Sequence, residues 1–311
     1  MKPGLVTIIL PAYNAAEYLG DTLAGITKQS YKKWELIVVE DGTNDGTRLI
    51  IKEFTEKNKI NRVIYIRHKK NKGRGATRNT AIGLAQGDYI AFLDQDDIWL
   101  ENHLEASINN LIVNHSDLSF STQIMFEDST GLIVDLWGPN KQELKNSPKS
   151  LFGRSFIGTS SVVMRTKSLK STDLFDTKLY CEDFDFWLNC VKHGLKFSHL
   201  PGCYCLYRKG HSNATTSRLD LILAGMVDVL KKYMDISIIS NKEIFKHIAH
   251  YYFAAGYYRA MIDWKSASIF FIKAWIIKWW RLDHLLLAFL GPLITPMTKL
   301  HFSLRKDKPL F

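Results

Sequence analysis

The chain has 311 residues, 46% of them hydrophobic, and carries a formal net charge of +10. This length and composition exclude a disordered chain and allow either one large α/β domain with an appendage or two domains. The positive charge is uneven, because residues 218–311 contain 14 Lys or Arg and 7 Asp or Glu and so hold most of the excess.

The first hundred residues alternate short apolar runs with amphipathic segments. The pattern predicts strands at 5–10, 36–39, 63–66 and 89–93, and helices at 15–29, 45–58 and 76–85. Strands and helices in alternation indicate a mostly parallel sheet that is covered by helices on both faces. Right-handed crossovers then bring the C-terminal ends of all four strands to one rim of the sheet.

The middle of the chain is less regular. The sequence predicts strands at 118–126, 161–164 and 196–200, a helix at 184–193, and a polar loop at 127–150. From about residue 219 the pattern is helical, with amphipathic segments at 244–262 and 267–280, so we expect one domain at 1–217 and a helical region at 218–311. The apolar segment 285–297 is broken by Gly and Pro and is too short to span a bilayer.

The C-terminal region is basic and rich in aromatic residues, which is typical of contact with an anionic partner. A membrane surface, a nucleic acid and a simple solvated face all fit this composition, and packing of the apolar segments against the α/β domain is a further interpretation. No nucleic-acid motif is visible. We therefore expect no nucleic-acid partner and keep the anionic membrane as a candidate.

The cysteines and the N-terminal segment indicate the compartment. The four cysteines match no zinc spacing and include no CxxC pair, which favours free thiols in a reduced cytosol. The first residues lead directly into a predicted strand, and no signal peptide is recognised there. The expected location is cytoplasmic, with peripheral attachment to the inner face of the plasma membrane as an option.

The most informative motif is Asp94-Gln95-Asp96-Asp97, which directly follows the predicted strand at 89–93. In open α/β sheets, ligands bind at the rim where strands end. Two carboxylates at such a position can face one hard cation that also carries a substrate diphosphate. A solvated loop with a helix N-cap is the alternative for this motif taken alone.

Three further polar clusters follow predicted strands. The first, Pro11 to Asn14, lacks a GxGxxG pattern, which argues against a dinucleotide dehydrogenase. The second, Glu40 to Thr47, offers a carboxylate for a nucleobase N–H, and Asp45 is suited to cap the next helix. The third, Asn71 to Asn79, combines a helix N-terminus with basic residues and so favours a diphosphate.

Five segments in order resemble the GT-A type of family 2 glycosyltransferases. They are Val6–Asn14, Val38–Thr47, Gly75–Ile82, Gly87–Asp97 and Cys181–Trp187. The resemblance covers about the first 215 residues and implies a Rossmann-like, mostly parallel sheet flanked by helices, here with a C-terminal helical extension. Glu40 departs from the usual Asp, and the tail lacks the QxxRW signature of processive members, which favours transfer of one sugar per event.

The resemblance also implies roles for individual residues. Tyr13 and Asp41 would hold the base, Arg78 with Arg74 or Lys72 would meet the phosphates, and Asp183 would be the general base. Asp94 and Asp96 would bind Mn²⁺ or Mg²⁺, with Asp94 also near the ribose, and residues 207–211 would form a flexible loop over the diphosphate. The implied donor-binding set is Pro11, Tyr13, Asn14, Asp41, Arg74, Arg78, Asp94, Glu182 and His211.

These roles predict an inverting, metal-dependent transfer from a nucleotide sugar, with UDP favoured, to a hydroxyl of a saccharide or lipid-linked saccharide of the bacterial cell envelope. Two alternatives stay open at this point. A sugar-phosphate nucleotidyltransferase shares the nucleotide-binding layout, although it would need a Gly-rich phosphate loop after the first strand. A non-enzymatic basic module that binds nucleic acid is the other.

Overall fold

A computed structural model describes residues 4–57, 62–210, 219–260, 262–278, 281 and 284–289. The chain forms two compact units. Unit 1 comprises Met1–Leu151, Ser155–Lys178 and Glu182–Ala214, and unit 2 comprises Phe152–Arg154, Leu179–Cys181 and Thr215–Phe311. Residues 211–218, where the sequence predicts the domain boundary, lie outside the described residues, so that boundary stays a prediction.

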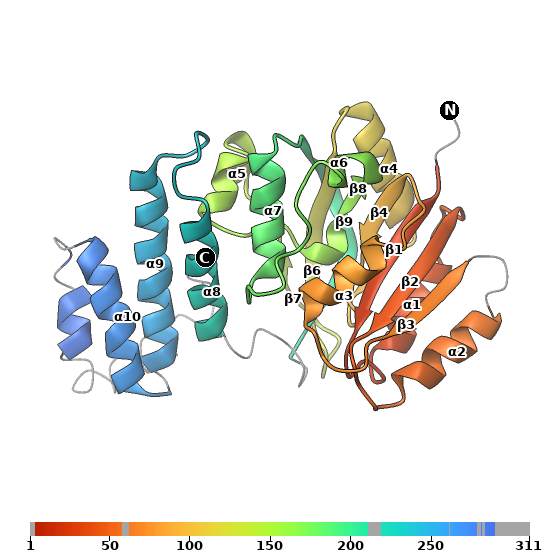
Figure 1. Cartoon of the computed structure of the whole chain (residues 1–311), viewed down its shortest axis with the longest axis horizontal. Coiled ribbons are helices and arrows are strands. Elements are labelled where there is room, and N and C mark those ends of the chain that lie inside the picture. Colours follow the sequence, from red (N-terminus) through yellow and green to blue (C-terminus); the bar gives the residue numbers. More distant parts are fainter. Residues whose placement is uncertain are drawn as a thin grey trace. The chain divides into compact units, whose positions relative to one another are not determined.

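The first half of unit 1 has the predicted alternation of strands and helices (Figure 1). Its elements are β1 (Val6–Ala12), α1 (Leu19–Thr27), β2 (Trp34–Glu40), α2 (Thr47–Lys57), β3 (Val63–Arg67), α3 (Arg74–Ile82) and β4 (Tyr89–Phe92). β1, β2 and β4 are buried along their whole length, which explains their continuous apolar runs. All four strands pair in parallel, so their C-terminal ends share one rim as predicted.

The second half of unit 1 extends the same sheet. Its elements are β5 (Ile98–Trp99), α4 (His103–Val113), β6 (Leu118–Glu127), β7 (Ile133–Trp137), α5 (Lys141–Lys145), η1 (Lys149–Phe152), η2 (Thr159–Ser161), β8 (Val163–Arg165), α6 (Thr166–Leu169), α7 (Glu182–Lys192) and β9 (Phe197–Lys209). The strand order is β3-β2-β1-β4-β8-β6-β9-β5, with β7 paired to β6. β8 is antiparallel to β4 and β6, so the sheet is mixed rather than simply parallel.

Three sequence predictions need correction here. The segment 127–150 is not one loop, because β7 pairs with β6 and Lys141–Lys145 forms a short helix with a capping box at Asn140. β9 does not end at Leu200 but continues to Lys209, since Pro201 and Gly202 are absorbed in a bulge and Gly202 takes a φ of 101°. The sequence reading also missed α4 and the two-residue strand β5.

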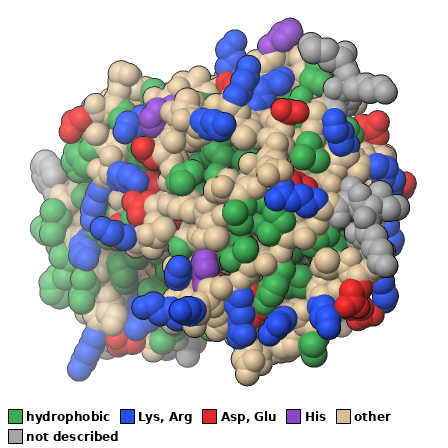
Figure 2. All heavy atoms as spheres, turned by 45° about the vertical axis from the view of Figure 1, so that its right-hand side comes forward, with side chains coloured by type: hydrophobic (Ala, Val, Ile, Leu, Met, Phe, Trp, Pro, Cys, Tyr) green, Lys and Arg blue, Asp and Glu red, His purple; other side chains and the backbone are tan. Residues whose placement is uncertain are grey.

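Large apolar side chains from α1 and the strands form the main core of unit 1. Leu19, Leu23 and Ile26 of α1 share this core with Ile8, Leu36 and other strand residues, and the five named side chains are at most 2% exposed. Outside this core, Lys and Arg side chains are spread over the face drawn in Figure 2, with hydrophobic side chains between them. The four cysteines are free, as expected.

His103 lies at the start of α4 and stacks on Trp99, with ring centroids 4.6 Å apart. Its side chain is fully buried, and neither ring nitrogen has a hydrogen-bond partner among the described residues. Burial disfavours the charged imidazolium and lowers the pKa of His103 to about 3. Unfolded histidine titrates near 6.5, so unfolding takes up a proton below that pH and stability must fall as the pH drops from 6.5 towards 3.

Wild type should therefore lose about 1.5 kcal/mol of unfolding free energy through His103 between pH 6.5 and pH 5. His103→Phe, which keeps a stacking ring but cannot be protonated, should lack this part of the loss. Urea unfolding at the two pH values checks it, with His115→Asn on the surface as the control that keeps the wild-type dependence. An equal loss in wild type and His103→Phe would contradict the prediction.

Unit 2 contains three longer helices, α8 (Leu219–Lys232), α9 (Asn241–Ala260) and α10 (Trp264–Ile277), which bear out the predicted helical pattern. Asp263 caps α10 by accepting hydrogen bonds from the backbone N–H groups of Lys265 and Ser266. None of the helices built from the described residues is long and apolar enough to cross a membrane. Of the apolar segment 285–297, residues 290–297 lie outside the described residues.

Candidate active site

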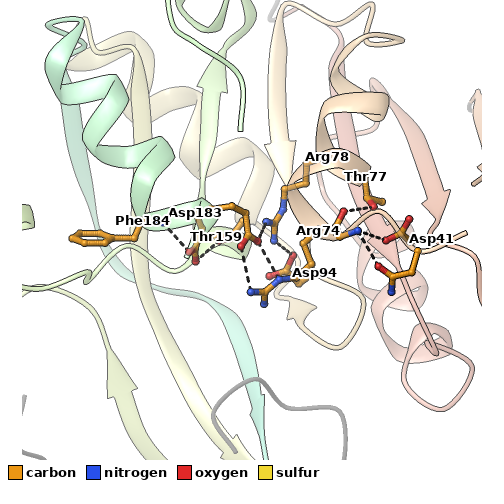
Figure 3. A network of polar contacts seen from close by, with 11 residues as sticks. Asp41, Arg74, Thr77, Arg78, Asp94, Thr159, Asp183 and Phe184 are labelled. Atoms are coloured by element: carbon orange, nitrogen blue, oxygen red, sulfur yellow. Dashed lines mark hydrogen bonds and ion pairs between the residues drawn. The ribbon is translucent and has the colours of Figure 1, made fainter. Parts of the chain in front are cut away.

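Arg78 on α3 is the centre of the polar network at the sheet rim (Figure 3). It is 1% exposed and places one terminal nitrogen 2.6 Å from Asp94 Oδ1 and the other 2.7 Å from Glu182 Oε1. Burial alone would lower the pKa of Arg78, but the charges of Asp94 and Glu182 outweigh it and raise that pKa. The buried cation therefore ties the end of β4 to the start of α7.

Arg74 lies one helical turn before Arg78 and faces the same carboxylate. Its Nε is 3.1 Å from Glu182 Oε1, and 45% of its side chain is exposed. This differs from the sequence prediction, in which Arg78 was the first candidate for the phosphates. The structure directs Arg78 at two carboxylates inside the protein and leaves Arg74 as the more accessible cation of the pair.

The Asp94–Asp97 segment is held by hydrogen bonds to its backbone. Ser160 Oγ accepts a hydrogen bond from Asp94 N at 3.0 Å, and Arg208 Nε donates to the carbonyl oxygen of Asp96 at 3.0 Å. Asp97 is 2% exposed, and burial, followed by the charges of Asp96 and Asp94, raises its pKa well above the usual range. Asp94 and Asp96 keep partly exposed side chains on this fixed loop, although Asp94 Oδ1 is paired with the buried Arg78.

This donor set fits a hard divalent cation. No group of three or more His, Cys, Asp or Glu side chains suited to a metal occurs among the described residues. Magnesium sites that act on phosphates commonly use only one or two carboxylates and take their remaining ligands from water and substrate. Asp94 and Asp96, two residues apart at a strand end, supply that number with oxygen ligands of the right kind.

Asp183 lies in the first turn of α7, next to Glu182, and projects towards the same network (Figure 3). Its carboxylate accepts hydrogen bonds from Phe184 N at 2.8 Å and from Thr159 Oγ1 at 3.4 Å. The side chain is partly exposed, whereas the following Phe184 is buried and anchors the helix. The geometry thus presents one accessible carboxylate on a rigid helix start, as a general base requires.

Asp41 is placed differently from Asp94 and Asp183. It is 3% exposed, and its oxygens accept the backbone N–H groups of Lys72 and Gly73 at 2.8–3.0 Å and lie 2.7 Å from His68 Nδ1. These contacts fix the turn that leads into α3, and the predicted contact with a base stays a prediction. Asp45 accepts from Thr47 N at 3.2 Å and so caps α2, as expected.

The other residues of the β1 cluster lie at the same rim. Tyr13 is 44% exposed, and the side-chain amide of Gln95 both accepts from its N–H and donates to its carbonyl oxygen. Asn14 takes a φ of 50° and accepts a hydrogen bond from Thr43 Oγ1. Pro11 is buried within β1. Gln95 therefore joins the loop after β1 to the loop after β4, a contact that the sequence did not indicate.

The predicted flexible loop at 207–211 needs correction, because residues 207–209 are the end of β9. Arg208 is 7% exposed, and its guanidinium bonds Asp128 at 2.6 Å and Asp21 at 2.9 Å. The sequence did not indicate that Arg208 supports the Asp96 backbone. This contact depends on the pairing of β9 with strands that lie far from it in the sequence. His211, which the resemblance placed in the donor-binding set, lies outside the described residues.

A mixed α/β sheet with carboxylates and arginines gathered at the ends of its parallel strands is typical of α/β enzymes that bind nucleotides at this rim. The family model "Glycosyl transferase family 2" matches residues 7–172, and the chain belongs to this family of glycosyltransferases. The nucleotidyltransferase and the non-enzymatic alternatives are therefore wrong.

Three known proteins are each similar to this chain over most of their own length. The UDP-Glc:alpha-D-GlcNAc-diphosphoundecaprenol beta-1,3-glucosyltransferase WfgD of Escherichia coli is 31% identical over 219 residues, 70% of this chain and 82% of that protein. The structure resembles S. aureus TarS with UDP-GlcNAc (TM-score 0.65, 19% identity, 86% of this chain and 81% of TarS). It also resembles the mannosyltransferase PcManGT of Pyrobaculum calidifontis in complex with GDP-Man and Mn²⁺ (TM-score 0.61, 14% identity). This likeness covers 99% of this chain and 89% of PcManGT.

Proposed function

We propose that this glycosyltransferase moves one sugar from a UDP-sugar to a hydroxyl of a lipid-linked saccharide, with inversion at the anomeric carbon. The observation that carries the proposal is the network in which Arg78 and Glu182 tie the Asp94 loop to the helix that presents Asp183. UDP and the lipid-linked acceptor are proposed because the similar WfgD is named for both.

The rim residues are suited to hold the donor. The leaving diphosphate gains negative charge as the bond to the sugar breaks, and the exposed part of Arg74 can stabilise that charge. Mn²⁺ or Mg²⁺ bound by Asp94 and Asp96 would neutralise further charge on the diphosphate. Tyr13, exposed at the end of β1, is proposed to pack on the base, with Pro11, Asn14 and Asp41 beneath it.

Asp183 is proposed to remove the proton from the acceptor hydroxyl as that oxygen attacks the anomeric carbon. The hydrogen bonds from Phe184 N and Thr159 Oγ1 orient the carboxylate. A single base that activates the acceptor gives one displacement, and one displacement inverts the anomeric centre. Phe186 and Trp187, which follow Asp183 on α7, are fully buried and belong to the core.

A thermal-shift measurement tests the cation and nucleotide part of the proposal. UDP with Mn²⁺ should raise the melting temperature of wild type, since a ligand at one hundred times its Kd adds about 2.7 kcal/mol. Asp96→Asn, which removes a charged ligand but little volume, should lose the part of the shift that depends on Mn²⁺. Glu101→Gln, an exposed carboxylate five residues away, is the matched control and should behave as wild type. An unchanged Mn²⁺-dependent shift in Asp96→Asn would overturn the assignment.

A further inference from the structure

One side of α10 carries isoleucines and lysines together on the surface. Ile269 and Ile276 are 54% and 64% exposed, and Lys265 and Lys273 are exposed beside them. Separations of three, four and seven residues place these four side chains within one arc of the helix. We call them the α10 stripe.

The opposite side of α10 is already used for packing. Ala267, Phe271 and Ala274 are 0% exposed, and Phe271 makes an edge contact with Phe253 of α9 at 5.6 Å between centroids. This core fixes the rotation of the helix about its own axis. The α10 stripe therefore faces outward in unit 2 because the small and aromatic residues of the other side face inward.

A group of cations lies near the C-terminal end of α10. α9 and α10 lie side by side and run in opposite directions (Figure 1), because Gly256 of α9 packs against Phe271 while Lys273, further along α10, lies 5.5 Å from the ring centroid of Tyr252, one turn earlier on α9. The first half of α9 therefore lies beside the second half of α10. Lys278 is partly buried there, and the charges of Arg281 and then Lys246 add to burial in lowering the pKa of Lys278. Lys246 and Arg281 are thus each near enough to repel Lys278, and the backbone N–H of Arg281 donates to the carbonyl oxygen of Lys278 at 2.8 Å. We call these three residues the basic cluster.

The acidic residues of this part of the chain are engaged elsewhere. The described residues from 219 onward include nine Lys or Arg and five Asp or Glu. Each of the five acids caps a helix, holds a turn or lies within ion-pair distance of a basic side chain: Asp220 with Arg259, Asp228 with Lys231, Asp235 with Asn241, Glu243 with Ser240 and Asp263 with Ser266. None of these five acids lies in the α10 stripe, so the described charged side chains of the stripe are all basic.

We propose that the α10 stripe and the basic cluster bind the surface of an anionic lipid bilayer. Isoleucine side chains can enter the boundary between headgroups and acyl chains, while the lysines extend along them to the phosphates. The charge of the surface complements anionic headgroups, and apolar and basic groups interleave along one helix, as an interfacial helix requires. This inference deepens the proposed function, because a lipid-linked acceptor lies at a membrane.

Vesicle co-sedimentation of the full chain tests the proposal. Wild type should sediment with phosphatidylcholine vesicles that contain phosphatidylglycerol and should bind pure phosphatidylcholine vesicles at least tenfold less, roughly as expected when headgroup charge contributes. Ile269→Glu/Ile276→Glu should lower the partition coefficient for anionic vesicles by about tenfold or more. Lys246→Gln/Lys278→Gln/Arg281→Gln should lower it and weaken its dependence on salt.

Two matched control variants carry substitutions of the same chemical kinds at exposed positions of unit 1. Leu49→Glu/Val113→Glu replaces two apolar side chains that are 71% and 74% exposed, and Lys167→Gln/Lys170→Gln removes two exposed lysines. Both should sediment as wild type. Circular dichroism and melting temperature check that each variant is folded.

Three outcomes would overturn the membrane assignment. They are failure of wild type to bind anionic vesicles, equal binding by the stripe variant, and a stripe variant whose only change is from dimer to monomer in light scattering. The last result would identify the α10 stripe as an interface between copies of the chain. The assay contains no nucleotide sugar, so failure of UDP-sugar turnover with intact vesicle binding would reject the proposed function alone.

Discussion

Asp183→Asn is expected to lower the rate of sugar transfer by about 10²–10⁴, because an amide cannot take a proton from the acceptor hydroxyl. The substitution keeps the size of the side chain and can still accept from Phe184 N and Thr159 Oγ1. The start of α7 should therefore stay in place, and UDP binding should be unchanged. Release of UDP from UDP-glucose and UDP-GlcNAc measures the rate, and calorimetry with UDP and Mn²⁺ measures binding.

Asp176→Asn is the control for Asp183→Asn, since it removes a nearby carboxylate of unit 1 that has no place in the proposed chemistry. It should retain wild-type turnover. Turnover of Asp183→Asn within threefold of wild type would reject Asp183 as the base. Loss of UDP affinity in parallel with loss of rate would instead assign Asp183 to donor binding.

Arg78→Met should lower the unfolding free energy by about 3 kcal/mol or more, the usual cost of removing one partner from a buried ion pair. Methionine fills much of the same volume, but Glu182, which is 4% exposed, then loses its closest cation. Asp94 loses its cation as well, so the Asp94 loop should be less well held. Urea unfolding gives the stability, and Mn²⁺-dependent UDP binding reports on the loop.

A second substitution separates charge from packing at Arg78. Arg78→Met/Glu182→Gln removes the uncompensated buried charge and should recover part of the lost stability, which a double-mutant cycle would show as a coupling between the two sites. Lys52→Met, whose side chain is 72% exposed and 3.9 Å from Glu56, is the surface control and should change stability by less than about 0.5 kcal/mol. A loss below about 1 kcal/mol in Arg78→Met would contradict the buried-pair interpretation.

Hydrophobic periodicity was sufficient to predict those strands and helices whose pattern depends only on neighbouring residues in the chain. The continuous apolar runs of β1, β2 and β4 and the amphipathic patterns of α1 and α2 depend on neighbours in the chain, and the structure has each of them within a few residues. The bulge in β9 could not be predicted in this way. Its continuation past Pro201 depends on pairing with β6, some eighty residues earlier, and that pairing is absent from any local pattern.

The positions of the site residues could be predicted in part for the same reason. Acidic and basic clusters that follow parallel strands must meet at one rim, so Asp41 and Asp94 were correctly expected near α3, which contacts Asp41 through Gly73 and Asp94 through Arg78. The burial of Arg78 could not be foreseen, because it results from Glu182, which approaches from more than a hundred residues away. The support of the Asp96 backbone by Arg208 has the same origin.

The sequence by itself determined the class of fold, the family and the identity of the carboxylates at the ends of the strands, since these depend on order and spacing along the chain. Only the tertiary structure decided which charges are buried, which stay accessible and which hold one another in place. The physical reason is that burial and ion pairing depend on distances between side chains brought together by the sheet, and a linear pattern carries no such distances. Arg78 and Arg74 lie one helical turn apart on α3, yet Arg78 is buried and 45% of the Arg74 side chain is exposed.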